Sequence, residues 1–415
     1  MKKMGLVILG LGVLLIGIIN FNKEEKKVLV EEEINNSNTS LVFMLQDKEG
    51  NYNKSEELPS SGYSFNTSKS VCSNNTTPTW EDNKLYLNNL NKNGTSCYLY
   101  FDVLPLAKET ILANSKVNEG TPDFSQVATT DEGIYKAEDD WGDSYYFRGA
   151  VENNYVKFAG YYWRIIRING DGSIRIIYDG TSAHANGESS NDRQIGNTVY
   201  NNLRNDNAYV GYMYTSGQVH GLETDSTIKG VLDDWYTTNI ANKGYGDKIS
   251  KEAGFCGDRE PSTSSSSSNG AGGTGTIATY YGGYIRLVND RKEPILKCNS
   301  SADLYTVSGS NKGNKALTNP IGLITADEIG MSGAVWNINN YNYFLYTGNT
   351  VWSISPSYSE GWFNTRMFLI DSNGWLSSDY VDSIWGVRPV INLASDVTLS
   401  GTGTASDPYI VEGAE

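Results

Sequence analysis

The chain has 415 residues, a formal net charge of −15 and two histidines. Nucleic acids and anionic membrane surfaces are bound through basic patches, so this acidic balance argues against both as partners. Hydrophobic residues make up 39% of the sequence, enough for a packed core, and 28 tyrosines with many Asn, Ser, Thr and Gly residues are typical of β-rich surface proteins. The length is that of two or three domains.

The chain begins with an export signal. Lys2 and Lys3 precede residues 5–19, which read GLVILGLGVLLIGII and contain no charged side chain. A helix over residues 5–21 would be about 25 Å long, close to the ~30 Å hydrocarbon thickness of a membrane. We therefore expect residues 1–22 to form an N-terminal transmembrane helix that anchors the protein in the membrane, and residues 23–38 to form a polar stalk.

Retention or removal of this segment stays open. The end of the apolar run, residues 17–21, is a poor cleavage site, which favours a permanent anchor over a removed signal peptide. Lysines flank the run on both sides, so the orientation is argued from the paired cysteines of the body rather than from the positive-inside rule. The sequence predicts a single-pass protein of the cell membrane whose bulk is extracytoplasmic.

Four cysteines fall into two well-separated pairs, Cys72 with Cys97 and Cys256 with Cys298. Three connectivities are possible, and proximity favours a disulfide within each pair. Loops of this length would each stabilise the fold by about 3–4 kcal/mol. Reduced thiols in a cytoplasmic protein are the alternative, which the export signal disfavours. A zinc ribbon is not expected, because no CxxC motif occurs.

Residues 39–103 predict a small β-sandwich-like module. A module of this size commonly needs a covalent staple, and a Cys72–Cys97 disulfide would supply it. Asn93-Gly94 is expected to form the turn before the last strand. Apolar or alternating runs predict the strands of this module at residues 41–45, 63–65, 85–87 and 97–101.

A helix and a linker, over residues 104–132, are expected to lead into a larger α+β domain over residues 133–394. The helical part is predicted at residues 104–117. Asn169-Gly170-Asp171-Gly172 joins two strongly apolar strands and predicts a hairpin turn. A calcium loop is disfavoured there, because the further acidic positions of that motif are missing.

Two more helices are predicted, one over residues 227–242 and one starting at Thr325. Ser- and Gly-rich sequence predicts a flexible loop over residues 261–276. Residues 395–415 are expected to form a tail with one short strand. The strands predicted in the last part of the large domain lie at residues 343–346, 351–353, 367–370, 375–377 and 385–393.

The end of the large domain carries a recognisable pattern. Trp352-Ser-Ile-Ser-Pro356 is followed by a hairpin at residues 368–375 and by Gly386-Val-Arg-Pro-Val390, with residues 323–328 (LITADE) upstream. This order resembles an uncharacterised family of Firmicutes-type bacterial surface proteins with a C-terminal GVRP domain. The resemblance implies a C-type-lectin-like fold, which is shared with formylglycine-generating enzymes.

The chemistry of those relatives is not implied. The Glu-Pro-Asn and Gln-Pro-Asp motifs of calcium-dependent lectins are missing, so calcium-dependent sugar binding is not carried over. The formylglycine-generating enzymes use a reactive cysteine pair in the terminal half, whereas Cys256 and Cys298 lie upstream of the GVRP block. Similarity of fold alone does not transfer a function.

No catalytic constellation, cofactor or metal site is predicted. His184 and His220 lie in small polar runs and are expected to be surface loop residues rather than members of a catalytic triad. Solvation or a turn explains each candidate acid of a glycoside hydrolase more simply than catalysis does. Those candidate carboxylates are Asp139, Asp140, Glu360 and Asp371.

The main functional signal is the density of aromatic and amide residues over residues 336–362. Tyrosine and tryptophan supply rigid contact area with a polar tip, and amides supply adaptable hydrogen bonds, which suits glycan or protein ligands. The residues predicted to bind ligand are Tyr341, Tyr346, Tyr358, Trp362, Asn340 and Asn349.

We therefore expect a membrane-anchored surface protein that binds or adheres to a glycan or a protein outside the cell. Two alternatives stay open. One is a structural component of the cell envelope or of a filament, which would self-associate through its aromatic surface. The other is an envelope enzyme such as a glycoside hydrolase, for which the sequence offers no constellation of residues.

Overall fold

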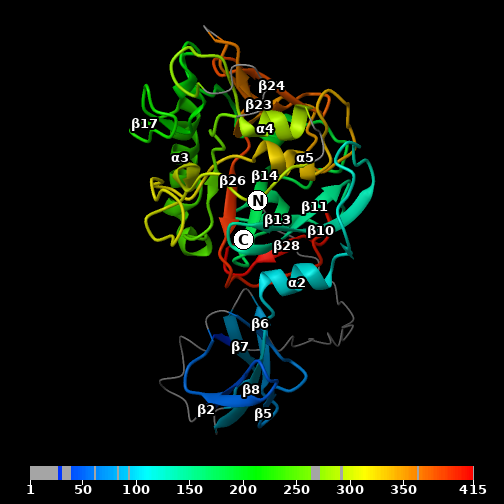
Figure 1. Cartoon of the computed structure of the whole chain (residues 1–415). Helices are drawn as coiled ribbons and strands as arrows, with labels where there is room; N and C mark the ends of the chain where they lie inside the picture. The colour runs from blue at the N-terminus through cyan, green and yellow to red at the C-terminus, as the bar shows by residue number, and fades with distance from the viewer. Residues whose placement is uncertain are drawn as a thin grey trace, which may run out of the picture. The chain divides into compact units, whose positions relative to one another are not determined.

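The computed structural model describes residues 27–29, 39–59, 62–81, 84–91, 94–262, 272–289, 293–361 and 364–414. The chain divides into two compact units, one ending at Val103 and the other beginning at Leu104 (Figure 1). Strands dominate both units, so the prediction of a β-rich protein is confirmed. The Cys72–Cys97 and Cys256–Cys298 disulfides are both formed, one in each unit.

The predicted fold class is wrong in its first element. Among the residues that the structure describes, no helix combines the length and the apolar character needed to cross a membrane. The expected anchor over residues 1–22 lies outside the described residues, as does most of the expected stalk. The fold class is therefore corrected, for the part of the chain that the structure describes, to a β-rich architecture with short helices, in which the predicted transmembrane helix finds no support.

The first unit packs two sheets around one core. Its strands are β1 (Lys27–Leu29), β2 (Thr39–Gln46), β3 (Tyr52–Ser55), β4 (Tyr63–Phe65), β5 (Val71–Cys72), β6 (Thr77–Glu81), β7 (Lys84–Asn88) and β8 (Thr95–Val103). One sheet has the order β3-β2-β8-β4 with β5 on β8, and the other has the order β1-β7-β6. Alternate residues of β8, among them Leu99 and Phe101, point into the core, where they meet Leu85 and Leu87 of β7. The expected Asn93-Gly94 turn lies partly outside the described residues.

The second unit is built on a nine-stranded sheet. Its strands are β9 (Val117–Asn118), β10 (Asp131–Asp139), β11 (Gly142–Gly149), β12 (Tyr155–Phe158), β13 (Tyr161–Ile168), β14 (Ile174–Gly180), β26 (Val390–Leu393), β27 (Leu399–Ser400) and β28 (Tyr409–Val411). Strands β13 and β14 form the predicted hairpin at Asn169–Gly172 and lie at the centre of the sheet. Both are buried along most of their length, which explains their nearly continuous apolar sequences.

A second, five-stranded sheet has the order β15-β25-β21-β23-β24. Its strands are β15 (Asn197–Val199), β21 (Val351–Pro356), β23 (Arg366–Ile370), β24 (Leu376–Tyr380) and β25 (Ile384–Gly386). Three short pairs complete the unit: β16 (Met213–Tyr214) with β17 (Thr224–Asp225), β18 (Phe255–Cys256) with β20 (Leu304–Tyr305), and β19 (Thr279–Tyr280) with β22 (Tyr358–Ser359).

The helices are short and pack around these sheets (Figure 1). They are α2 (Ala107–Ala113), α3 (Thr227–Asn239), α4 (Gly282–Tyr284) and α5 (Ala326–Met331), with a π-helical turn at Ile285–Asn289 and 3-10 turns at Asn191–Arg193, Asn207–Val210, Ala241–Lys243, Gly246–Lys248 and Ser301–Asp303. Helix α5 begins as the sequence predicts: Thr325 Oγ1 accepts from Glu328 N, and Glu328 Oε2 accepts from Thr325 N.

Two predicted strands of the second unit are wrong. Residues 343–346 form a turn, with Tyr343, Phe344 and Leu345 fully buried. Residues 385–393 form two strands in two different sheets, β25 and β26, because the chain breaks between them at Arg388 and Pro389. The helix predicted over residues 104–117 is shorter than expected and spans Ala107–Ala113.

Candidate functional site

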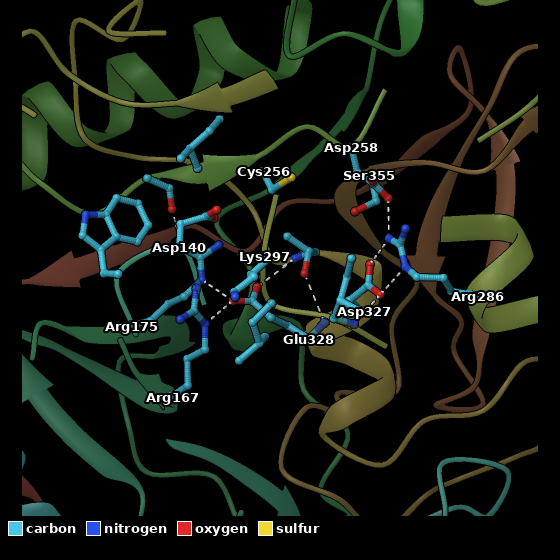
Figure 2. Close-up of a pocket in the computed structure, with 16 residues that line it drawn as sticks. Asp140, Arg167, Arg175, Cys256, Asp258, Arg286, Lys297, Asp327, Glu328 and Ser355 are labelled. Carbon is cyan, nitrogen blue, oxygen red and sulfur yellow. Dashed lines mark hydrogen bonds and ion pairs between the residues drawn. The ribbon is translucent and has the colours of Figure 1, made fainter. Parts of the chain in front are cut away.

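Several places in the described part of the second unit combine polar side chains with empty space, and two of them are described as candidate sites. The first is a small enclosed cavity beside the Cys256–Cys298 disulfide (Figure 2). Figure 2 shows Arg167 and Arg175 converging on Glu328, while Arg286 points to Asp258 and Asp327.

The arginines of this cavity are paired within the fold. Arg167 Nε lies 2.8 Å and Arg175 Nε lies 2.6 Å from Glu328 Oε1. Arg286 donates from Nε to Asp327 Oδ1 at 2.9 Å and from Nη2 to Asp327 Oδ2 at 2.7 Å. This two-point contact is the geometry in which a guanidinium binds a carboxylate most strongly. Arg167 additionally lies 2.6 Å from Asp139.

Burial and ion pairing shift the carboxyl pKa values in opposite directions. Burial would raise the pKa of Glu328, but Arg175 and Arg167 outweigh it and hold that pKa below its usual value. Burial raises the pKa of Asp258 to about 6, although Arg286 opposes the shift. Burial also raises the pKa of Asp140, against the hydrogen bond from Cys298 N.

The cavity itself has a volume of about 20 Å³, room for about one water molecule. Its arginines and carboxylates are matched to one another rather than directed at an open space. We therefore assign this network to the folded core, where it ties β13 and β14 to α5.

The second place is an open groove of about 700 Å³ at one end of the five-stranded sheet. This volume lies within the range of small-molecule and glycan sites. Amides, hydroxyls and one carboxylate dominate its lining, with Trp385 and the exposed Ile384 as apolar surface. The groove is lined by Asn191, Gln194, Ile195, Gly196, Asn197, Gly348, Asn349, Thr350, Asp371, Ser372, Ile384, Trp385 and Gly386.

Four chain segments build this groove: residues 191–197, 348–350, 371–372 and 384–386. Strand pairing brings Asn197 opposite Gly386, which places the residues after the Asn191–Arg193 turn against β25. Gln194 Nε2 donates to Asn197 Oδ1 at 2.8 Å, and Trp385 Nε1 donates to Asp379 Oδ2 at 2.9 Å, so both side chains are held in position. Preformed polar groups of this kind lose little entropy on binding a ligand.

The predicted ligand residues do not converge on one site. Asn349 lines the groove, where its Nδ2 also donates to Ser190 O. Tyr341 and Tyr346 pack edge to face, with ring centroids 5.7 Å apart, and Tyr341 Oη donates to Asn373 in the β23–β24 turn. The same turn supplies Asp371 and Ser372 to the groove. Tyr341, at 47% exposure, is the most accessible of the predicted tyrosines.

Asn340 has a structural role instead. It is 1% exposed, and its Nδ2 donates to Ala128 O and Gly333 O at 2.9 and 3.0 Å. Tyr358 lies in a separate aromatic cluster with Tyr280 and Tyr284. Trp362 lies outside the described residues.

The groove residues that the sequence did not reveal come mainly from residues 191–197 and 384–386. Asn191, Gln194 and Asn197 lie in a polar stretch without a recognisable motif, so no local signal marked them. Trp385 was predicted to lie in a single long core strand, whereas it lies in the short strand β25, pairs with Thr198 of β15 and lines the groove.

Both histidines lie in loops, as predicted, but His184 is buried rather than on the surface and His220 is partly exposed. His184 is 5% exposed, with Nδ1 2.7 Å from Glu188 Oε1 and Nε2 3.0 Å from Asp192 Oδ2. His220 Nδ1 lies 3.4 Å from the buried Asp303, whose carboxylate raises the pKa of His220. Among the described residues, no serine, threonine or cysteine side chain contacts either ring as a nucleophile would.

The candidate acids of a glycoside hydrolase are also dispersed. Asp139 is buried in its ion pair with Arg167 and is therefore not a solvated charge, although its Oδ1 does accept from Trp141 N in the β10–β11 turn. Asp140 faces the enclosed cavity, Glu360 is exposed, and Asp371 caps its own turn through Asn373 N. In the part of the chain that the structure describes, no group of three or more histidine, cysteine, aspartate or glutamate side chains is arranged to hold a metal ion.

Comparison with known proteins adds no relative to this picture. No family model, no curated protein and no solved structure matches the chain. The likeness to a surface-protein family with a GVRP domain and the C-type-lectin-like fold that it implies therefore remain predictions, and the groove is interpreted from its own chemistry.

Proposed function

We propose that this protein works outside the cytoplasm and binds a glycan in the groove between β25 and the β23–β24 turn. The observation that carries the proposal is the lining of the groove: four amides, two hydroxyls and one carboxylate beside the tryptophan Trp385. Sugars present hydroxyl groups that amides can bind as donors and acceptors, and apolar C–H faces that pack on an aromatic ring.

Two further features support this proposal. The disulfides Cys72–Cys97 and Cys256–Cys298 suit an oxidising compartment, since structural disulfides are rare where thiols are kept reduced. The groove is also open, and Asp371 is the single carboxylate among its described lining residues, so its chemistry favours binding over hydrolysis.

A glycan array probed with the full-length protein tests the proposal, followed by calorimetric titration of the glycans that bind. Trp385→Ala should weaken binding about tenfold or more, because tryptophans at the centre of a binding surface typically contribute ~2 kcal/mol or more. Asn191→Ala removes an exposed amide of the groove and should weaken binding by a smaller factor.

Asn242→Ala is the matched control, because it removes an exposed amide that lies elsewhere, in the Ala241–Lys243 turn. It should bind as the unmodified protein does. The proposal fails if no glycan binds, or if the groove variants and the control bind equally well. If the groove binds a protein and no glycan, the partner belongs to a different class and the glycan proposal is wrong.

A further inference from the structure

The second unit contains an arginine whose surroundings differ from those of the other described arginines. Elsewhere in the described residues, each guanidinium has a carboxylate, carbonyl or amide oxygen as a partner, as Arg193 and Arg388 have in Asp179. Arg366, at the start of β23, has neither an ion pair nor a side-chain hydrogen bond to a described residue. Its Nε is buried and has no acceptor among the described residues.

Aromatic rings hold this side chain in place. Arg366 lies opposite Tyr380 in the β23–β24 pair, so the two side chains share one face of the sheet. The guanidinium carbon of Arg366 lies 4.0 Å from the ring centroid of Tyr380 and 5.4 Å from that of Tyr358. Arg204, paired with Asp382 at 3.5 Å, contacts the same Tyr380 ring at 4.3 Å. Stacking on aromatic faces orients a guanidinium but leaves its N–H groups free to donate.

A cluster of tyrosines continues this surface. Tyr280 and Tyr358 face each other across the β19–β22 pair, with ring centroids 5.5 Å apart and planes inclined by 11°. Tyr284 of α4 packs edge to face against both rings. All three tyrosines are half-buried, and their hydroxyls make no hydrogen bond to another residue in the described part of the chain.

We propose that Arg366, with the tyrosines around it, binds the carboxylate or phosphate group of an anionic ligand. The planar guanidinium offers paired N–H donors that match the two oxygens of either group. A buried N–H without an acceptor is costly, and an anion bound at Arg366 would remove that cost. The aromatic rings next to it would contact the remainder of the ligand.

Charges nearby limit the strength of this site. Glu360 is exposed, and its negative charge helps to raise the pKa of Tyr358, which burial raises most. Asp382 forms an ion pair with Arg204. The net charge of −15 adds a general repulsion of anions, which salt screens. The anion site therefore depends on local donors rather than on a basic surface, and it does not rest on the proposed glycan groove.

Calorimetric titration of the full-length protein with glucuronate and with glycerol phosphate tests the inference, with glucose and glycerol as neutral counterparts. At least one anion should bind, and neither neutral compound should bind here. Binding of glucuronate alone assigns the site to carboxylates, and binding of glycerol phosphate alone assigns it to phosphates. If neither anion binds at low ionic strength, the inference is overturned.

Arg366→Gln should weaken binding of the anion about tenfold or more, because a charge-assisted hydrogen bond is lost. Lys251→Gln removes one exposed positive charge elsewhere and should leave the affinity unchanged. Arg366→Lys keeps the charge but lacks the Nε donor and the planar fork, and it should bind several-fold more weakly than the unmodified protein. If Arg366→Gln does not fold, Arg366→Lys still tests whether Arg366 binds the anion. Anion affinity that is unchanged in either Arg366 variant contradicts the assignment.

Discussion

Arg388 Nη2 donates to Asp179 Oδ1 at 2.8 Å, and both side chains are almost fully buried. Arg193 Nε donates to the same oxygen at 2.8 Å, so one carboxylate pairs with two guanidinium groups. Arg388 also donates to Tyr178 O and Leu345 O. These contacts turn the chain inward between β25 and β26, and they explain why the GVRP segment is not one continuous strand.

This pair gives the first prediction. Arg388→Met should lower the free energy of unfolding by about 3–5 kcal/mol, because removing one partner of a buried pair leaves uncompensated polar groups. Urea denaturation followed by circular dichroism measures the change. Lys297→Gln breaks the exposed pair between Lys297 and Glu138 and should cost about 1 kcal/mol or less. Equal losses in the two variants would show that Arg388 has no special role in the fold.

The second prediction concerns pH. The pKa of Asp258 is raised from 3.8 to about 6 in the folded state, so the folded protein holds this proton more tightly than the unfolded chain does. The contribution of Asp258 to stability is therefore present below pH 4 and is lost as the pH rises from 4 through 6. The loss is at most about 3 kcal/mol, since one pKa unit corresponds to about 1.4 kcal/mol.

Asp258→Asn removes this titration while keeping the shape of the side chain. Its stability relative to the unmodified protein should therefore improve between pH 4 and pH 7, as measured by urea denaturation at each pH. Asp234→Asn, which neutralises an exposed carboxylate on α3, is the charge-matched control. A pH-independent difference between Asp258→Asn and the unmodified protein would contradict the raised pKa.

The disulfides give the third prediction. Cys72 and Cys97 are separated by 25 residues, and their bond lies in the first unit between β5 and β8. Replacing both with alanine should lower the stability of that unit by about 3–4 kcal/mol, because the unfolded chain gains freedom. Hydrogen exchange read by mass spectrometry should show faster exchange in β2 and β8.

The matched variant replaces Cys256 and Cys298, which are separated by 42 residues in the second unit. In this variant the faster exchange should appear around β18 and β20 instead. Loss of protection in the same unit for both variants would be inconsistent with two separately stabilised units.

Two glycine substitutions form the fourth prediction, with effects of opposite sign. A Cβ at Gly386 would lie 2.1 Å from Gln194 Oε1 and 2.9 Å from a Val351 methyl group, so Gly386→Ala should cost about 1–3 kcal/mol. A Cβ at Gly230, inside α3, meets nothing within 4 Å. Gly230→Ala should raise stability by about 0.5–1 kcal/mol, since alanine is the better helix former. Thermal unfolding of both variants measures the signs, and a stabilising Gly386→Ala would refute the close contact.

Much of the local structure could be predicted from the sequence because its causes are local. The turn at Asn169–Gly172, the capping box of Thr325 and Glu328, and the alternating pattern of β8 each depend on residues a few positions apart. The disulfides followed from spacing in the same way. The buried role of Arg167 and Arg175 was less visible, although charges inside apolar strands do signal paired groups.

The candidate sites could not be predicted to the same extent. Asn340 and Asn349 look alike in sequence, yet one is bonded to Ala128 O and Gly333 O in the interior and the other lines the groove. The sequence around His184 predicts a surface residue, but Glu188 and Asp192 contact both nitrogens of its ring. Exposure depends on what packs against a residue from distant segments, and periodicity within one segment carries no information about that.

By itself, the sequence determined that this protein is β-rich, acidic and joined by two disulfides, because composition and short-range spacing suffice for those properties. Only the tertiary structure decided where the groove and the surroundings of Arg366 lie. Strand pairing across long separations brings Asn197 to Gly386 and Tyr280 to Tyr358. The same folding pairs the guanidinium groups of the interior with acceptors and leaves Arg366 without one in the part of the chain that the structure describes, since each partner comes from another part of the chain.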